Sequence, residues 1–273
     1  MTTTWAPGPA TALRAELETL ATTSPGRWAF AVRESGHQLA SVNGDTVMPA
    51  ASTIKVALML FVLRDIAVGR RSLDDVLDVP DVRAGGAGVL NALPSVRRLR
   101  LDEVVELMIV VSDNTAANMI IDLLGAPALD KRLAELGTTH TRLQRRLMDL
   151  EAAKTGLRNV TTADDQALLL DRLVGPGLLP PELRELALGV LGRQQFNDRM
   201  PARLGADVVC RHKTGEITGV RHDVGVLEFD GRQVVLAALG SELDDPASHA
   251  ERPGPAADII AEAAATVVRL ART

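Results

Sequence analysis

The hydrophobic residues of this chain follow two periods, one typical of helices and one typical of strands. Helical spacing of leucines predicts a first helix over Ala10–Ala21, and a closing helix is predicted over Ala256–Leu270. Short apolar or alternating runs bounded by turn residues predict five strands. These strands are Trp28–Arg33, Gln38–Val42, Val208–Thr214, Arg221–Phe229 and Gln233–Leu239.

Between the two groups of strands the pattern is mainly helical. Val56–Val68 is apolar nearly all round, which is typical of a helix buried in a core. Thr138–Thr161 has no clean period and is predicted to be a long loop, a type of segment that is more often functional than idle. The remaining helices are predicted over Asp102–Val111, from a cap at Asn114 or Thr115 to Leu124, from Pro127 to Gly137, Gln166–Leu173 and Pro181–Leu191.

Strands near both ends of the chain, with helices between them, predict an α/β (α+β) fold. Both ends of the chain would complete one antiparallel sheet flanked by the two terminal helices, and an all-α domain would be inserted. We predict that residues 10–50 and 205–273 form the α/β domain and that residues 51–204 form the helical domain.

Composition and charge narrow the classes of function. The chain has 273 residues, of which 46% are hydrophobic and 24% are charged, as in ordinary globular proteins. A net charge of −5 gives no basic surface, so a nucleic-acid partner is not expected. No apolar run reaches the length of a membrane span, and residues 1–7 show no secretory signal. We therefore expect no membrane partner and a cytoplasmic location, which the single cysteine, Cys210, also fits.

The candidate chemistry is concentrated in three short motifs. Ser52-Thr53-Ile54-Lys55 opens the buried helix and places a hydroxyl and an amine on one helix face, one turn apart. There the lysine can act as the base that a serine needs to attack a carbonyl. Ser112-Asp113-Asn114 lies between two predicted helices, and Lys213-Thr214-Gly215 ends a predicted strand. Only four of the 30 basic residues are lysines, and two of the four lie in these motifs.

The set and order of these motifs occur in class A β-lactamases and penicillin-binding proteins. The chain resembles the class A branch of these penicillin-recognising serine acyl-transferases over nearly its whole length. The resemblance implies that Ser52 is the nucleophile and Lys55 its base in acylation. It also implies that Ser112 relays a proton to the leaving nitrogen, while Lys213 holds that hydroxyl and the substrate carboxylate.

The resemblance further implies a set of substrate-binding groups. Asn114 would bind the amide side chain of the substrate, and Thr214, beside Gly215, would bind its carboxylate. The backbone N–H groups of the nucleophile and of Glu216 would form the oxyanion hole. Arg221 falls near the position of a carboxylate-binding arginine, and an ordinary surface residue on a strand is the alternative. No pair of histidines or carboxylates has metal-ligand spacing, so we expect no metal and no cofactor.

The predicted long loop departs from the class A pattern. In class A enzymes a segment Arg-x-Glu-x-x-Leu-Asn supplies the glutamate that activates the deacylating water. Here Leu147 takes the position of that glutamate, Glu151 that of the asparagine, and Asn159 that of an aspartate that pairs with the loop arginine. Because a leucine cannot move a proton, three alternatives are open. Asp149 or Glu151 replaces the base, Lys55 alone activates water, or the acyl-enzyme is long-lived or passes its acyl group to an amine or alcohol.

The sequence therefore predicts a serine acyl-enzyme hydrolase that cleaves an amide, lactam or ester bond of a small molecule through Ser52. Loss of general-base help, typically worth about 10²–10⁴-fold, would impair or alter deacylation. The alternatives are a transacylase and a penicillin-binding or sensor protein with a long-lived acyl-enzyme. His212 flanks the third motif, but strand alternation points it away from Lys213, so it is not expected to be catalytic.

Overall fold

The computed structural model describes Trp5, residues 7–244 and residues 254–273. The segment that carried the expectation about secretion, residues 1–7, lies mostly outside these described residues, so the cytoplasmic location stays a prediction. Within the described part of the chain, no helix has both the length and the apolar composition needed to cross a membrane.

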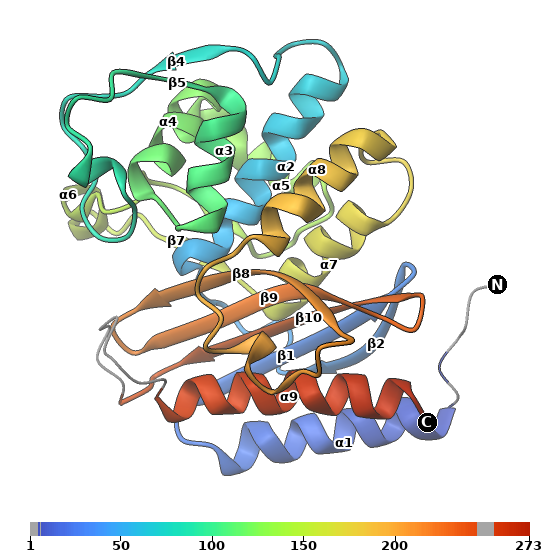
Figure 1. The fold of residues 1–273 in the computed structure, drawn as a ribbon. Helices are drawn as coiled ribbons and strands as arrows, with labels where there is room; N and C mark the ends of the chain where they lie inside the picture. The colour runs from blue at the N-terminus through green and yellow to red at the C-terminus, as the bar shows by residue number, and fades with distance from the viewer. Residues whose placement is uncertain (1–4, 6, 245–253) are drawn as a thin grey trace.

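A five-stranded antiparallel sheet, with strand order β2-β1-β10-β9-β8, forms the middle layer (Figure 1). Two strands come from the N-terminal part of the chain and three from the C-terminal part. The prediction of one antiparallel sheet completed by both ends of the chain is therefore confirmed. The strands are β1 (Arg27–Glu34), β2 (His37–Val42), β8 (Val209–Ile217), β9 (Val220–Phe229) and β10 (Arg232–Ser241).

Two helices from the ends of the chain cover one face of the sheet. Helices α1 (Pro7–Thr23) and α9 (Pro255–Ala271) lie side by side beneath the strands (Figure 1). Their apolar faces, which include the fully buried Leu13 and Ile260, join one hydrophobic core with the sheet. This arrangement confirms the two terminal helices predicted from the spacing of hydrophobic residues.

Alternation along β1 decides which layer each side chain joins. Trp28 and Phe30 face α1 and α9, and their rings stack with centroids 6.0 Å apart. Ala29 and Ala31, which alternate with them along the strand, belong to the core on the opposite face. Large side chains thus fill the space under the terminal helices, and small ones let the second layer of helices approach the sheet closely.

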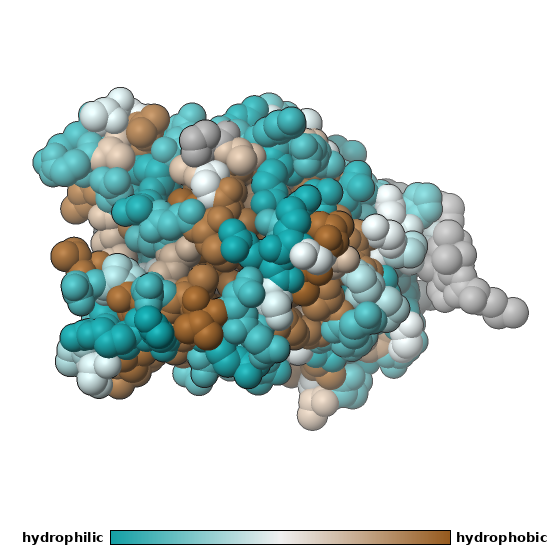
Figure 2. Space-filling model, turned by 90° about the horizontal axis from the view of Figure 1, so that it is seen from above, coloured by the Kyte–Doolittle hydropathy of each residue, from teal (hydrophilic) through white to brown (hydrophobic). Residues whose placement is uncertain are grey.

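The second layer of helices covers the other face of the sheet, and the buried α2 lies in its interior. Seen from the side of this layer, hydrophobic side chains are scattered among hydrophilic ones at the surface (Figure 2). The helices of this layer are α2 (Ile54–Ala67), α3 (Leu101–Val110), α4 (Asn114–Leu124), α5 (Ala126–Glu135), α6 (Leu150–Lys154), α7 (Ala163–Val174) and α8 (Pro181–Gly192).

Shorter elements connect these layers. Three are 3₁₀ turns: η1 (Ala51–Thr53), η2 (Leu90–Ala92) and η3 (Met200–Arg203). Five are short strands: β3 (Met48–Pro49), β4 (Val76–Asp78), β5 (Arg98–Arg100), β6 (Arg142–Leu143) and β7 (Asn159–Thr161). The proposed division into residues 10–50 with 205–273 and residues 51–204 stays a prediction.

Two sequence predictions are wrong in detail. Asp113, and not Asn114 or Thr115, caps α4, because its carboxylate accepts a backbone N–H of the first turn at 3.0 Å. The segment Thr138–Thr161 is not a loop throughout, since it contains β6, α6 and β7. Strand β7 pairs with β3, which is far away in sequence, so no local period reveals it.

Candidate active site

Ser52 lies in η1, directly before the buried helix α2. The preceding Ala51 has a φ of 45°, a left-handed conformation that is strained for a residue with a side chain and is typical of functional sites. Ser52 lines a cavity of about 310 Å³ at the junction of the helices and β8. Other residues that line this cavity include Ser112, Asn114, Met148, Thr214 and Glu216.

The side chain of Lys55 is fully buried, and its Nζ contacts four oxygen atoms. It donates to Ser112 O at 2.7 Å and to Asn114 Oδ1 at 2.8 Å, and it lies 3.1 Å from both Ser52 Oγ and Ser112 Oγ. A neutral amine has two hydrogens, and these two carbonyl oxygens, which can only accept, use both of them. The lone pair is therefore left for the hydroxyl proton of a serine, as a base for Ser52 requires.

Burial also favours the neutral form of this amine. Burial first, and then the positive charge of Lys213, lower the pKa of Lys55 well below its ordinary value, while the charge of Asp113 opposes the shift. The lowered pKa enlarges the fraction of neutral Lys55, which is the form that can accept the proton of Ser52.

Ser112 connects α3 to α4 through a positive φ of 55°, and Asp113 fixes this turn. The carboxylate of Asp113 accepts the backbone N–H groups of Val89 at 2.8 Å and Leu90 at 2.9 Å. A side chain at Gly88, whose φ is 127°, would overlap that carboxylate, so only glycine fits there. Asp113 is thus a structural partner, and it positions the glycine-rich wall of the cavity.

Lys213 lies on β8 and is fully buried. Burial first lowers its pKa to about 7, with the charge of Arg199 acting in the same direction and that of Asp223 against it. Its Nζ donates to Thr214 O at 2.8 Å, and within the described residues it forms no hydrogen bond with Ser112. Lys213 therefore acts on the lysine–serine pair through its charge, and its predicted hold on the Ser112 hydroxyl stays a prediction.

Gly215 lets β8 approach the turn that carries the nucleophile. A Cβ at this position would lie 3.2 Å from Thr53 N and 3.3 Å from Ala51 Cβ, tighter than ordinary contacts. Because glycine has no Cβ, Thr214 and Glu216 reach the same cavity as Ser52. The oxyanion hole at the backbone of Ser52 and Glu216 stays a prediction.

Leu147 is fixed above α4 through its backbone. Its N–H donates to Asn118 Oδ1 at 2.8 Å, and its carbonyl accepts from Asn118 Nδ2 at 3.0 Å. The leucine side chain packs against the core around α2, and the next residue, Met148, lines the cavity. Asn159 also ties this segment together, because its amide bonds the N–H and the carbonyl of Arg145.

Asp165 holds the start of the same segment. Its buried carboxylate accepts the backbone N–H groups of Thr139, His140 and Thr141 at 2.9, 2.9 and 2.7 Å, and the hydroxyl of Thr141 at 2.8 Å. We expect Asp165→Asn to lower the free energy of unfolding by about 1–3 kcal/mol, because an amide NH₂ would face donors that the carboxylate now accepts. Denaturant unfolding measures this loss.

A surface aspartate provides the matched control. Asp122 pairs with Arg146 at 2.6 Å and its side chain is 48% exposed. Asp122→Asn should change the free energy of unfolding by less than about 1 kcal/mol, as is usual for surface pairs. Equal stability of Asp165→Asn and the wild type would contradict the role given to Asp165.

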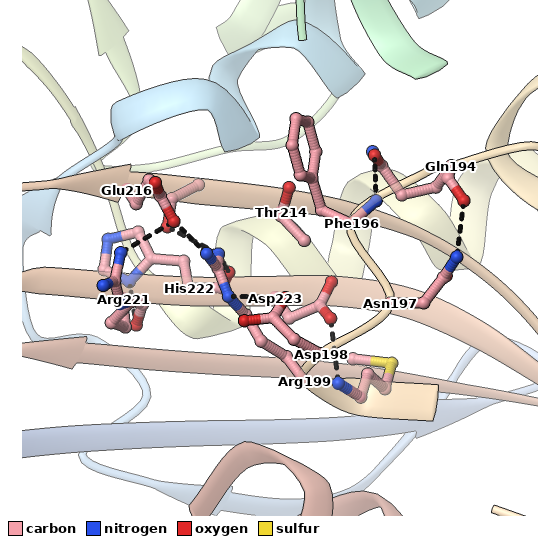
Figure 3. Close-up of polar contacts among 12 residues, drawn as sticks. Gln194, Phe196, Asn197, Asp198, Arg199, Thr214, Glu216, Arg221, His222 and Asp223 are labelled. Atoms are coloured by element: carbon pink, nitrogen blue, oxygen red, sulfur yellow. Dashed lines mark hydrogen bonds and ion pairs between the residues drawn. The ribbon is translucent and has the colours of Figure 1, made fainter. Parts of the chain in front are cut away.

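Sequence reasoning missed one residue close to the site, Arg199. It lies directly before η3, its side chain is only 4% exposed, and it pairs with Glu216, as Figure 3 shows. No motif or period marks this arginine, because it reaches the site only through the packing of η3 against β8 and β9. Arg221 Nη1 also pairs with Glu216 Oε2, at 2.7 Å, so its carboxylate-binding role stays a prediction.

The buried histidine next to the third motif is structural. His212 Nδ1 lies 2.8 Å from Asp223 Oδ1, and its Nε2 lies 3.1 Å from Asn197 Oδ1, so it ties the segment before η3 to the sheet. It does not line the cavity. Among the residues that the structure describes, no three histidine, cysteine or acidic side chains are grouped to hold a metal ion.

Comparison with known proteins assigns the family. A family model described as the β-lactamase enzyme family matches residues 12–270. The chain belongs to the β-lactamase enzyme family. A β-lactamase from Streptomyces albus G is 33% identical over 218 residues, which cover 75% of this chain and 68% of that protein.

Solved structures of this family have the same fold. The structure of PBP-A has a TM-score of 0.83 and 30% identity, and the match covers 96% of both chains. A variant of PBP-A with a leucine replaced by glutamate, in an acyl-enzyme complex with penicillin G, has a TM-score of 0.82 and 30% identity over 96% of this chain and 97% of that one. The protein is thus a class A β-lactamase-like serine hydrolase, as the three motifs predicted.

Proposed function

We propose that the protein forms an acyl-enzyme on Ser52 from a small amide, lactam or ester and releases the acyl group slowly. The contacts of Lys55 support the first half of this proposal, because they leave its lone pair directed to a serine hydroxyl. The single observation that carries the second half is Leu147, which takes the position of the class A deacylating glutamate and packs, partly buried, against the core.

The carboxylates suggested by the sequence as replacements are engaged elsewhere. Asp149 caps α6, and the side chain of Glu151 is 83% exposed and pairs with Lys154 at 2.7 Å. Neither residue lines the cavity. Glu216 does line it, but two arginines bind its carboxylate. Without general-base help, which is typically worth about 10²–10⁴-fold, deacylation is slowed while acylation through Lys55 continues.

Intact-protein mass spectrometry tests this proposal. Wild-type protein incubated with penicillin G, or with a neutral thioester, should gain the mass of one acyl group and keep it after the free reagent is removed. Ser52→Ala should gain no mass, and wild-type turnover of a chromogenic cephalosporin should be slow. The PBP-A variant solved as an acyl-enzyme with penicillin G supports the choice of this probe. Rapid turnover without an adduct would contradict slow deacylation.

Transfer of the acyl group to an amine or alcohol is the second candidate function, and the same leucine favours it. An acyl-enzyme that water consumes slowly remains available to another acceptor, or persists as the signal of a penicillin sensor. Adding an amine such as glycinamide to the acylated protein separates these outcomes. A new amide product and faster adduct loss indicate a transacylase, and an unchanged adduct indicates a binding or sensor role.

A further inference from the structure

Glu216 presents a carboxylate to the cavity that contains Ser52. Among the described residues that line this cavity, it is the only one with a charged side chain. The side chain is 20% exposed, so it is within reach of a bound molecule. The predicted role of Glu216 uses only its backbone N–H, and its carboxylate has no part in that role.

Two arginines hold this carboxylate from the protein side. Arg221 Nη1 donates to Glu216 Oε2 at 2.7 Å, and Arg199 Nη2 donates to the same oxygen (Figure 3). The arginine side chains are 9% and 4% exposed, and neither lines the cavity. The glutamate therefore lies between the two guanidinium groups and any molecule bound in the cavity.

The position of Glu216 in front of the two arginines decides the sign of the charge closest to a bound ligand. Asp198 also lies 3.6 Å from Arg199 Nε, so the positive charge of the arginines is shared with a second carboxylate. Coulomb interactions weaken with distance, and Glu216 carries the one charged side chain among the described residues that line the cavity. Arg199 Nη1 donates to His222 O at 3.1 Å, so this nitrogen is also directed to the backbone. A second carboxylate at this end of the cavity would lie beside the first, and like charges at close range disfavour binding.

We propose that Glu216 selects acyl donors by charge, so that donors with a neutral or cationic leaving group react faster at Ser52 than matched donors with a carboxylate. This inference rests on the proposed function, because it concerns acylation of Ser52. It also departs from the role that the resemblance implies for Arg221, since Arg221 Nη1 already donates to the carboxylate of Glu216.

Three thioesters of hippuric acid provide matched donors: those of mercaptoacetate, mercaptoacetamide and thiocholine, which carry a negative, a neutral and a positive leaving group. In each reaction Ser52 Oγ bonds to the acyl carbon and the C–S bond breaks. The hydroxyl proton passes to Lys55 and then to the leaving thiolate. Released thiol gives kcat/KM, and each value is divided by the uncatalysed hydrolysis rate of that thioester to remove differences in thiol chemistry.

Wild-type protein should prefer the neutral and cationic donors over the anionic one, and Glu216→Gln should reduce this preference by about 10-fold. Glu228→Gln is the matched control, because Glu228 pairs with Arg211 at 2.7 Å, is also 20% exposed, and lies away from the cavity. It should keep the wild-type preference. Glu216→Asp, which retains the charge, should also keep it.

A measurement on the wild type alone guards against a variant that does not fold. Higher ionic strength screens charge, so it should raise the relative rate of the anionic donor. A wild-type preference for the anionic donor, or a preference that neither Glu216→Gln nor salt alters, would overturn this inference alone. Absence of acyl mass on Ser52 with all three donors would instead refute the proposed function, and this inference with it.

Discussion

Replacing Leu147 with glutamate shortens the lifetime of the acyl-enzyme, by about 10²-fold or more. General-base catalysis typically contributes about 10²–10⁴-fold, and the lower end is expected here because the side chain at position 147 packs against the core and does not line the cavity. Both backbone bonds between residue 147 and Asn118 remain in this variant, so the new carboxylate starts from a fixed position. The measurement is the loss of acyl mass with time after free penicillin G is removed.

Leu150→Glu is the control for this prediction. Leu150 lies in the same segment, at the start of α6, and its side chain is 62% exposed and does not line the cavity. The same change of charge at this position should leave the adduct lifetime unchanged. If the adduct of Leu147→Glu lasts as long as that of the wild type, the missing glutamate is not the cause of slow deacylation.

Lys55→Met slows acylation of Ser52 by about 10²–10⁴-fold, because the variant loses the amine that accepts the serine proton. Stopped reactions analysed by intact mass give the acylation rate. Lys154→Met is the control, since Lys154 is 71% exposed and pairs only with a neighbouring glutamate among the described contacts. Circular dichroism checks that both variants are folded. An acylation rate of Lys55→Met within tenfold of the wild type would exclude Lys55 as the main base.

The pH profile adds a second readout for Lys55. Its pKa is lowered, and the amine accepts a proton only when neutral, so the wild-type acylation rate should fall as pH decreases through that pKa. Lys213, whose pKa is about 7, becomes positively charged as the pH falls, and this charge further disfavours protonation of Lys55. The acidic fall should therefore be gradual in the wild type and absent in Lys55→Met.

Local sequence patterns were sufficient to predict the main helices and strands and the chemistry of the nucleophile. The strands and terminal helices follow from hydrophobic periods, which reflect contacts along each element. Ser52 and Lys55 are one helical turn apart, so sequence alone placed them together. The absence of a carboxylate at position 147 was also evident from the sequence, because it depends only on which residue occupies that position.

Contacts between distant segments could not be predicted in the same way. The cap of α4 was assigned to Asn114 or Thr115, but Asp113 is the cap. Its Oδ1 accepts an N–H of the first turn of α4, and its Oδ2 accepts the N–H groups of Val89 and Leu90. The pairing of β7 with β3 left no signal in the segment predicted as a loop. The first error arises because a polar side chain has several possible partners until the fold selects one. The second arises because β3 and β7 pair through their backbones across more than 100 residues of chain.

The sequence by itself determined the family, the sheet and terminal helices, the three motifs and the absence of the usual deacylating glutamate. Only the tertiary structure decided how the site is charged. Burial lowers the pKa of Lys55, and the bonds to Ser112 and Asn114, 57 and 59 residues away, leave its lone pair free. Packing likewise brings two arginines behind Glu216. These properties depend on desolvation and on distances across the fold, which no local pattern of residues encodes.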